Sequence, residues 1–343
     1  MGRVWHVLVA LGATGLVLGQ TIPAEAATPL NWVNKTAPPA GGPLVGDGHG
    51  DLFTFAVDAA GTGLTAYEYN PKTNRWSTRA TDSSYAPQDA DGGFYWESAT
   101  LAQDGRIIVL GGNGNANNDD LASVAAYSPA HNTWQTLAPL PHARYGAAAV
   151  TGPQGKIYAI GGDFGGDSGG NGEVTLQSVE AYSPTKNSWQ ELAPLNDPRY
   201  FAAAAVGSNG LIYVFGGCQQ GPNNAGDCSD ADTAEVLNPS SALNTWQLLP
   251  TMPTYFATCG MSGLCGPGAG GGAAATNGLI YLNGVGAYNP ANGTWTAFST
   301  SPATPLLVAP GGSKCDYLYG LGYFTGTGTL EMDRAALHKG TGC

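Results

Sequence analysis

The sequence predicts an all-β fold in which repeated four-stranded units form a closed ring. Gly (52) and Pro (23) are abundant among the 343 residues, as expected when short strands alternate with tight turns. Charged residues make up only 11% of the chain, against a usual level of about a quarter. One phrase also recurs: residues 126–145 read AYSPAHNTWQTLAPLPHARY, and residues 181–200 read AYSPTKNSWQELAPLNDPRY. Together these observations favour strands arranged in repeats.

Tryptophan marks the repeat most clearly. A phrase of the form Y-x-P-x-x-N-x-W, or a variant of it, ends at Trp76, Trp134, Trp189, Trp246 and Trp295. Each unit therefore holds four extended segments, here called a to d: a small-residue strand such as GAAAV, an apolar run such as KIYAIGG, a Tyr strand and a Trp strand. A lone four-stranded sheet cannot bury both faces. We therefore expect the units to pack radially, with the tryptophans filling the space between them.

These motifs resemble the Kelch family. Its signature is a glycine pair after strand b, a Tyr in strand c and a Trp in strand d, and the match covers nearly all of residues 27–343. The match is strongest in the units ending at Trp134, Trp189 and Trp246. The fifth unit replaces the glycine pair with Asn283-Gly284. The resemblance implies a Kelch-type β-propeller that binds partners with residues at the mouth of its central channel.

Six blades are expected. Five units end in Trp, and a sixth begins after Trp295 with LLVAP, CDYLYGL and TLEMDR but never reaches its own tryptophan. The missing phrase stands near the other end of the chain, in LNWVNKTAPPAGG (residues 30–42). Trp32 is thus expected to lie in strand d of the last blade and to close the ring. Closure removes the free sheet edge that invites aggregation.

Residues 1–26 have the features of a secretory signal peptide: Arg3, an apolar core and the small residues Ala24–Ala26. We expect residues 27–343 to form a single six-bladed domain that is secreted and extracellular. The net charge is −12, and the 13 Lys and Arg form no basic stripe, which argues against binding to nucleic acid or to an anionic membrane. A monomer is expected.

The chain contains six cysteines, all of them after residue 217. An even number in an exported chain suggests disulfides, with fifteen possible connectivities. Pairing neighbours in the sequence joins Cys218 to Cys228, Cys259 to Cys265 and Cys315 to Cys343. No Cys-x-x-Cys occurs, and the Asp/Asn/Gly loops 113–120 and 163–173 do not have EF-hand spacing. No metal and no cofactor is predicted.

The strand order predicts which face carries function. The a–b and c–d turns share one face, and the b–c and d–a connections share the other. The c–d turns are short and alike, whereas connections such as 113–123, 163–177 and 218–233 are long and different. Divergent loops on a rigid scaffold are typical of a binding site. We therefore expect the b–c and d–a loops to recognise a glycan or protein ligand.

The d–a loops lead into the innermost strands and supply the candidate ligand-binding residues. These are Tyr95, Trp96, Glu97, His142, Arg144, Tyr145, Arg199, Tyr200, Phe201 and Tyr255. Arg144 and Arg199 stand at the same place in consecutive repeats, each before a Tyr. Two roles remain open for them: contact with a carboxylate or sugar hydroxyls, or bracing of neighbouring blades.

A non-enzymatic binding module is the favoured function, and a sugar-processing enzyme is the alternative. A secreted six-bladed Kelch protein also resembles sialic-acid mutarotases, and this resemblance implies Glu97 as an acid/base group with Arg144 and Arg199 as carboxylate-binding groups. A copper radical site of the galactose oxidase type needs two well-placed His. Only His142 is well placed, so this site is not predicted.

Overall fold

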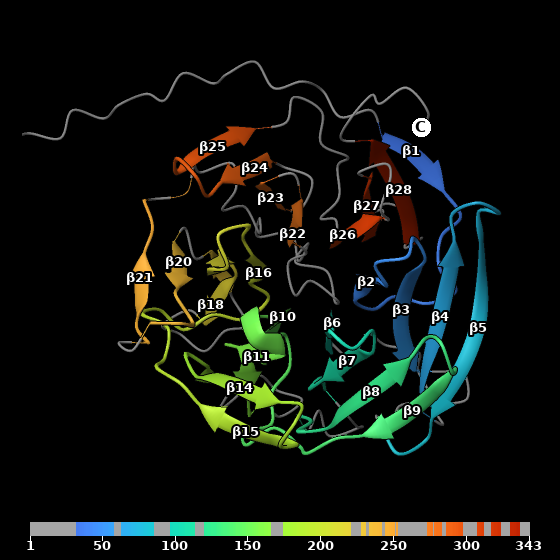
Figure 1. Cartoon of the computed structure of the whole chain (residues 1–343), viewed down its shortest axis with the longest axis horizontal. Helices are drawn as coiled ribbons and strands as arrows, with labels where there is room; N and C mark the ends of the chain where they lie inside the picture. The colour runs from blue at the N-terminus through green and yellow to red at the C-terminus, as the bar shows by residue number, and fades with distance from the viewer. Residues whose placement is uncertain are drawn as a thin grey trace, which may run out of the picture.

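Each repeated unit folds into an antiparallel sheet of four short strands, and the sheets are arranged around a central axis (Figure 1). The all-β prediction is confirmed. The computed structural model describes residues 32–57, 63–85, 97–113, 120–165, 174–220, 228–230, 233–241, 244–250, 252, 273–276, 278–282, 286–297, 307–311, 317–323 and 330–336. Within these residues there are six four-stranded sheets, here called the first to sixth blades, and two two-stranded sheets.

The first three blades follow the chain in order. The first contains β2 (Leu44–Gly46), β3 (Leu52–Val57), β4 (Leu64–Asn70) and β5 (Arg75–Asp82). The second contains β6 (Ser98–Leu101), β7 (Ile107–Leu110), β8 (Val124–Ser128) and β9 (Thr133–Thr136). The third contains β10 (Ala148–Thr151), β11 (Ile157–Ile160), β14 (Val179–Ser183) and β15 (Ser188–Glu191). A 3-10 helix, η1 (Pro153–Gly155), joins β10 to β11.

The remaining blades include both ends of the described chain. The fourth contains β16 (Ala203–Val206), β17 (Ile212–Phe215), β20 (Ala234–Leu237) and β21 (Trp246–Leu248). The fifth contains β22 (Ala273–Thr276), β23 (Leu279–Leu282), β24 (Gly286–Asn289) and β25 (Thr294–Ala297). The sixth contains β26 (Leu307–Gly311), β27 (Tyr317–Tyr323), β28 (Leu330–Ala336) and β1 (Trp32–Lys35). The two-stranded sheets pair β12 (Asp163–Phe164) with β13 (Val174–Thr175), and β18 (Cys218–Gln220) with β19 (Cys228–Asp230).

The hydrophobic core lies between blades rather than within any one sheet. The third and fourth blades share a cluster that includes Ile160, Val179, Ile212 and Val214, all fully buried. Similar clusters join the first blade to the second, the second to the third, and the fourth to the fifth. Burying one such side chain contributes about 1.5–3 kcal/mol. Stability therefore depends on neighbouring blades, as the repeat pattern predicts.

The Y-x-P-x-x-N-x-W phrase makes the contact between blades. In the second blade, Asn132 has a left-handed backbone (φ 53°), and its Oδ1 accepts hydrogen bonds from Tyr127 Oη (2.9 Å) and from the Ala80 amide of the first blade (2.8 Å). Trp134 Nε1 donates to the Ala80 carbonyl at 2.8 Å. Asn tolerates this backbone conformation better than most residues. The repeated Trp thus has the inter-blade role expected of it.

The same contact repeats around the ring. Trp189 donates to Ala138 O, and Trp246 to Ala193 O, in each case across to the preceding blade. Trp76 of the first blade donates to Thr36 O at 2.8 Å, directly after β1. Residue 36 therefore has the position that Ala80, Ala138 and Ala193 have in their blades. The segment after β1 docks on the first blade as a strand d of the sixth blade should.

Strand pairing confirms this ring closure. β1 pairs with β28 in antiparallel register, from Trp32 opposite Ala335 to Lys35 opposite Met332. The innermost strand of the sixth blade, β26, lies beside β2 of the first blade, and Figure 1 shows β1 and β28 next to each other. The two ends of the described chain share one sheet. Among the described residues, no helix has the length and apolarity needed to cross a membrane.

Candidate functional site

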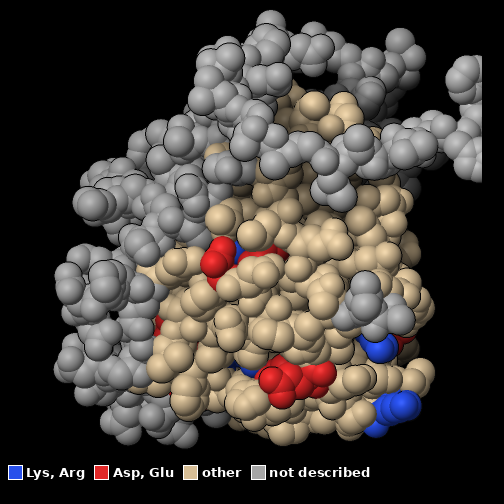
Figure 2. Space-filling model, turned by 90° about the vertical axis from the view of Figure 1, so that its left-hand side faces the viewer, with Lys and Arg blue, Asp and Glu red and all other residues tan. Residues whose placement is uncertain are grey.

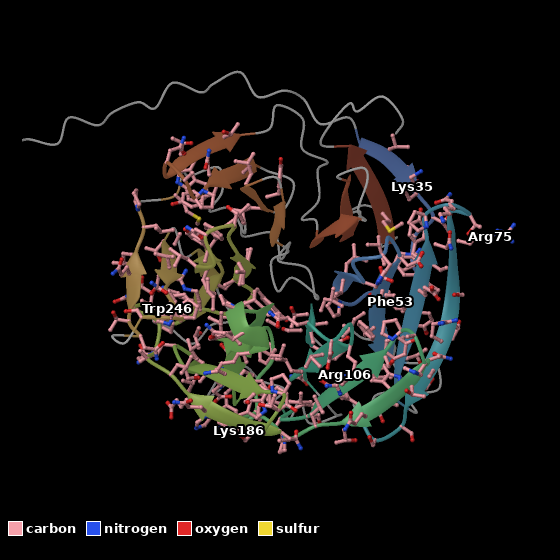
Figure 3. All side chains as sticks on the ribbon, viewed as in Figure 1. Lys35, Phe53, Arg75, Arg106, Lys186 and Trp246 are labelled. Carbon is pink, nitrogen blue, oxygen red and sulfur yellow. The ribbon has the colours of Figure 1, made fainter. Side chains whose placement is uncertain are left out.

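The antiparallel strand order brings the b–c and d–a connections to one face of the ring, here called the loop face. The a–b and c–d turns lie on the opposite face, here called the turn face. Lys186, labelled at the outer rim in Figure 3, is in a c–d turn. Arg106, labelled nearer the centre of the same figure, ends an a–b turn. Figure 2 shows one side of the molecule, on which the charged atoms form small separate groups rather than a continuous patch.

The glycine pair after strand b receives the backbone of the next d–a segment. Gly112 N donates to Arg144 O at 2.9 Å, and Arg144 N donates to Leu121 O at 3.1 Å. A Cβ on Gly161 would collide with the carbonyl oxygen of Arg199, so this close approach requires glycine. The backbone of each d–a segment is thus fastened to the blade that precedes it.

The Arg144 side chain reaches into the blade that follows it. Nη1 donates to Gly161 O at 2.8 Å, and Nη2 donates to Glu180 Oε1 of β14 at 2.6 Å. Both side chains are fully buried (0% exposed). Burial lowers the pKa of the Arg144 guanidinium, and the Glu180 carboxylate partly offsets this. Arg144 therefore joins the second blade to the third.

Arg199 repeats the arrangement between the third and fourth blades. Its amide donates to Leu176 O at 3.1 Å, and its carbonyl accepts from Gly162 N at 2.9 Å. Nη1 donates to Gly216 O at 2.9 Å and to Thr233 O at 3.0 Å, and Nη2 donates to Glu235 Oε1 at 2.8 Å. The side chains of Arg199 and Glu235 are 0% exposed.

Of the two roles left open for these arginines, the structure places them in the bracing role. Their donors face buried carbonyls and carboxylates, so in this arrangement neither guanidinium is presented to a ligand at the channel mouth. The other role left open, contact with a ligand, is therefore not the one observed. A guanidinium buried between two blades is stable only when it is paired and hydrogen-bonded, and both arginines meet this condition. Arg144 and Arg199 are called the inter-blade ties below.

Sequence reasoning missed Glu180 and Glu235, the partners of the ties. A signal for them was present: a Glu follows each Arg at a separation of 36 residues. In the sequence repeat that ends at Trp134, Phe94 corresponds to Arg144 and Ala125 corresponds to Glu180. The Arg and the Glu thus occur together in two repeats and are both missing from a third, as expected for residues that pair with each other.

An aromatic cluster does lie on the loop face. The ring of Tyr145 is 6.1 Å from those of Tyr200 and Phe201, and Tyr200 and Phe201 are 4.9 Å apart. Tyr145 is buried, whereas Tyr200 and Phe201 are partly exposed. The three candidate aromatic residues that the structure describes are therefore brought together.

Phe201 has a left-handed backbone with φ 54°, which is unusual for a bulky residue. Gly146 stands at the same place one repeat earlier, with φ 60°. The Phe201 amide donates to Gly146 O at 2.7 Å, and a Cβ on Gly146 would meet the Phe201 ring. Such a conformation costs about 1–3 kcal/mol and is found most often at functional sites.

Glu97 is a buried carboxyl at the loop face. It precedes β6 and is 4% exposed, and burial raises its pKa to about 7. A carboxyl that titrates near neutral pH can act as a general acid or base. However, the two arginines that the enzymatic alternative needs are paired with Glu180 and Glu235. The described residues therefore do not assemble the expected catalytic set.

His142 is the exposed neighbour of the first tie. Its Nδ1 lies 2.7 Å from Glu180 Oε1, and its side chain is 56% exposed. Among the candidates, Tyr95, Trp96 and Tyr255 lie outside the described residues. Within the described residues, no group of three or more His, Cys, Asp or Glu is arranged to hold a metal ion.

Of the six cysteines, Cys259, Cys265, Cys315 and Cys343 lie outside the described residues. Cys218 is disulfide-bonded. It lies in β18, which pairs with the strand that contains Cys228. The connectivity 218–228, 259–265 and 315–343 stays a prediction.

Comparison with known proteins finds a known repeat in the middle of the chain. The Kelch motif model matches residues 97–141, 143–196 and 199–253. This part of the chain consists of Kelch repeats. The three Kelch motifs coincide with the second, third and fourth blades, which contain both inter-blade ties and the aromatic cluster.

Curated relatives of this Kelch-repeat chain include alpha-scruin of Limulus polyphemus, 30% identical over 176 residues (51% of this chain, 18% of that protein). Another is Kelch-like protein 33 of Homo sapiens, 33% identical over 129 residues (38% of this chain, 22% of that protein). The match thus spans about a fifth of the length of these relatives. A solved structure described as the structure of YjhT aligns with a TM-score of 0.61 at 16% identity, over 92% of this chain and 96% of that one. This likeness concerns the fold.

Proposed function

We propose that this Kelch-repeat protein is an exported, non-enzymatic binding module whose loop face holds a protein or glycan ligand. The observation that carries the proposal is the cluster of Tyr145, Tyr200 and Phe201, with Phe201 held in a left-handed backbone. A strained aromatic residue at the rim of a rigid ring is maintained only if something else selects for it. Kelch repeats are themselves suggestive of protein binding.

The chemistry of the cluster suits either ligand class. The exposed parts of Tyr200 and Phe201 offer aromatic faces, and such faces pack on sugar rings and on apolar or cationic side chains. Tyr recurs at the equivalent place in four successive repeats, as Tyr95, Tyr145, Tyr200 and Tyr255. This recurrence in the sequence supports a binding surface that extends beyond one blade.

Substitution of Tyr200 tests this proposal. A glycan array and affinity capture from the extracellular fluid of the host would each be run with the wild-type chain, Tyr200→Ala and the turn-face control Lys186→Ala. A true ligand should lose at least about tenfold in affinity with Tyr200→Ala, as expected for an aromatic contact, and keep its affinity with Lys186→Ala. A ligand that binds all three equally would refute the loop-face site.

The raised pKa of Glu97 favours the sugar-processing alternative enough to test it. Because Arg144 and Arg199 are already paired, we expect no acceleration of sialic-acid anomerisation by the wild-type chain. Acceleration that disappears in Glu97→Gln would establish the enzyme instead. Export predicts that the mature protein begins near Ala27, which N-terminal sequencing measures, and size-exclusion chromatography tests the expected monomer.

A further inference from the structure

The glutamate of the first inter-blade tie is only half satisfied. Arg144 Nη2 and His142 Nδ1 both bond to Oε1 of Glu180, at 2.6 and 2.7 Å. Oε2 of Glu180 is buried without a hydrogen-bond partner, and so is Oγ of Ser178, two residues earlier. A buried carboxylate oxygen without a hydrogen-bond donor lowers the stability of the folded state. A group that supplied a donor at this point would therefore bind favourably.

The second tie meets the same demand with the chain's own donors. Asn196 donates to Oε2 of Glu235 from both its amide and Nδ2, each at 2.8 Å. Thr233 Oγ1, which corresponds to Ser178, donates to Asp197 Oδ2 at 3.2 Å. In the first tie, Pro141 and His142 stand at the places of Asn196 and Asp197. Proline has no N–H, so Glu180 cannot be satisfied in the same way.

A second carboxylate acts on the guanidinium in each tie. Glu191 of β15 lies directly opposite Glu180 of β14 and interacts electrostatically with Arg144. Leu248 stands at that place in the fourth blade, opposite Glu235. In the second tie, Asp197 Oδ2 lies 3.8 Å from Arg199 Nη2, so two carboxylates face one guanidinium in each tie. The two ties therefore differ in donors rather than in charge, because only the first has a glutamate oxygen without a hydrogen-bond partner.

We propose that the third blade binds the ammonium group of a lysine side chain from a protein ligand, with Glu180 Oε2, Ser178 Oγ and Glu191 as acceptors. An ammonium group supplies three donors, and Glu180 Oε2 and Ser178 Oγ are two buried acceptors without one. His142 Nδ1 lies 2.7 Å from Glu180 Oε1, and its side chain is 56% exposed. Exposed side chains change rotamer within nanoseconds, and in this proposal rotation of His142 admits the ammonium group. This inference rests on the proposed function and names the ligand chemistry.

The sequence around the loop face supports a basic ligand. Arg144 and Arg199 are the only Lys or Arg residues in six b–c and d–a segments of the sequence: 81–97, 111–123, 137–147, 161–178, 192–202 and 216–233. Both are neutralised by glutamates. The same segments contain many Asp and Glu. Such a charge distribution attracts a basic segment and repels an acidic one before contact is made.

Calorimetric titration of the full chain with a tetralysine peptide tests the site, with tetraglutamate as the control of opposite charge. The decisive variant is Pro141→Asn/His142→Asp, which gives Glu180 the donors that Glu235 already has. We expect it to weaken tetralysine binding at least tenfold and Glu191→Gln to weaken it several-fold. Asp104→Asn, a matched change of an exposed acid on the turn face, should leave binding unchanged.

The outcomes are separable. Equal binding of tetralysine to wild type and to Pro141→Asn/His142→Asp would mean nonspecific attraction and would overturn the proposal, as would the absence of tetralysine binding. If the double variant fails to fold, Glu191→Gln and Ser178→Ala decide the matter, since neither replaces a buried charge. Tyr200→Ala should retain tetralysine binding. A ligand that depends on Tyr200 but not on Glu191 would support the proposed function and refute this site.

Discussion

The two inter-blade ties share a geometry and differ in how completely it is satisfied. In both, the Arg backbone bonds to the preceding blade and the guanidinium bonds to a glycine carbonyl and a glutamate of the following blade. Glu235 accepts further bonds from Asn196 and Asp197, whereas one oxygen of Glu180 has no partner. Identical scaffold demands would produce identical surroundings. The difference suggests that the third blade gives up local stability for a binding role.

The largest effect is expected from removing a tie. Arg144→Met should lower the free energy of unfolding by about 3–5 kcal/mol, because it leaves Glu180 buried without its main partner. Arg199→Met should cost less, since Glu235 keeps three donors from Asn196 and Asp197. Denaturant unfolding measures both. An equal or larger cost for Arg199→Met would break the comparison. Arg144→Met/Glu180→Leu should recover much of the loss.

The second effect concerns Glu97, whose blade has no such tie in its sequence. Its pKa is raised to about 7 in the folded chain from 4.5. The folded state then binds more protons than the unfolded state between these values, so stability should fall as pH rises from about 4.5 to 7 and then level off. Glu97→Gln should remove this dependence and increase stability at pH 8 by about 2–3 kcal/mol. Thermal unfolding across pH measures it, and an unchanged profile would contradict the burial of a titrating carboxyl.

A smaller effect should follow from giving the third blade the donors of the fourth. Pro141→Asn/His142→Asp should raise the unfolding free energy by about 1–2 kcal/mol, as expected when a buried carboxylate gains hydrogen bonds. The melting temperature should rise accordingly. An unchanged melting temperature would mean that the missing hydrogen bonds at Glu180 do not lower stability, and it would contradict the difference between the two ties.

The smallest effect concerns Gly146 and Phe201, which share one place in consecutive repeats. Gly146→Ala should cost about 1 kcal/mol, because L-residues disfavour positive φ. The added Cβ would also push against the Phe201 ring. We expect ligand affinity to fall together with stability. Retained affinity at reduced stability would indicate that the position of Phe201 does not matter for binding.

Much of the fold could be predicted from the sequence because the repeat is local. Spacing and turn chemistry predict the four strands of a blade, and the phrase around Trp32 predicts the closure that β1 and β28 make. The loop face follows from antiparallel order alone. Tyr145, Tyr200 and Phe201 were also predictable, since each follows from its place in a repeat.

The roles of the arginines were not predictable in this way. From the sequence alone, Arg144 and Arg199 are polar residues in loops, where exposure is the ordinary expectation. Their burial depends on a glycine pair in one blade and a glutamate in the next, contacts that join segments far apart in the chain. Local periodicity thus determined the blades, their order and the closing strand, because hydrophobic alternation and turn residues act over a few positions. Only the tertiary structure decided which charges are neutralised and which acceptor, Glu180 Oε2, is left without a donor, because desolvation depends on what packs around a group.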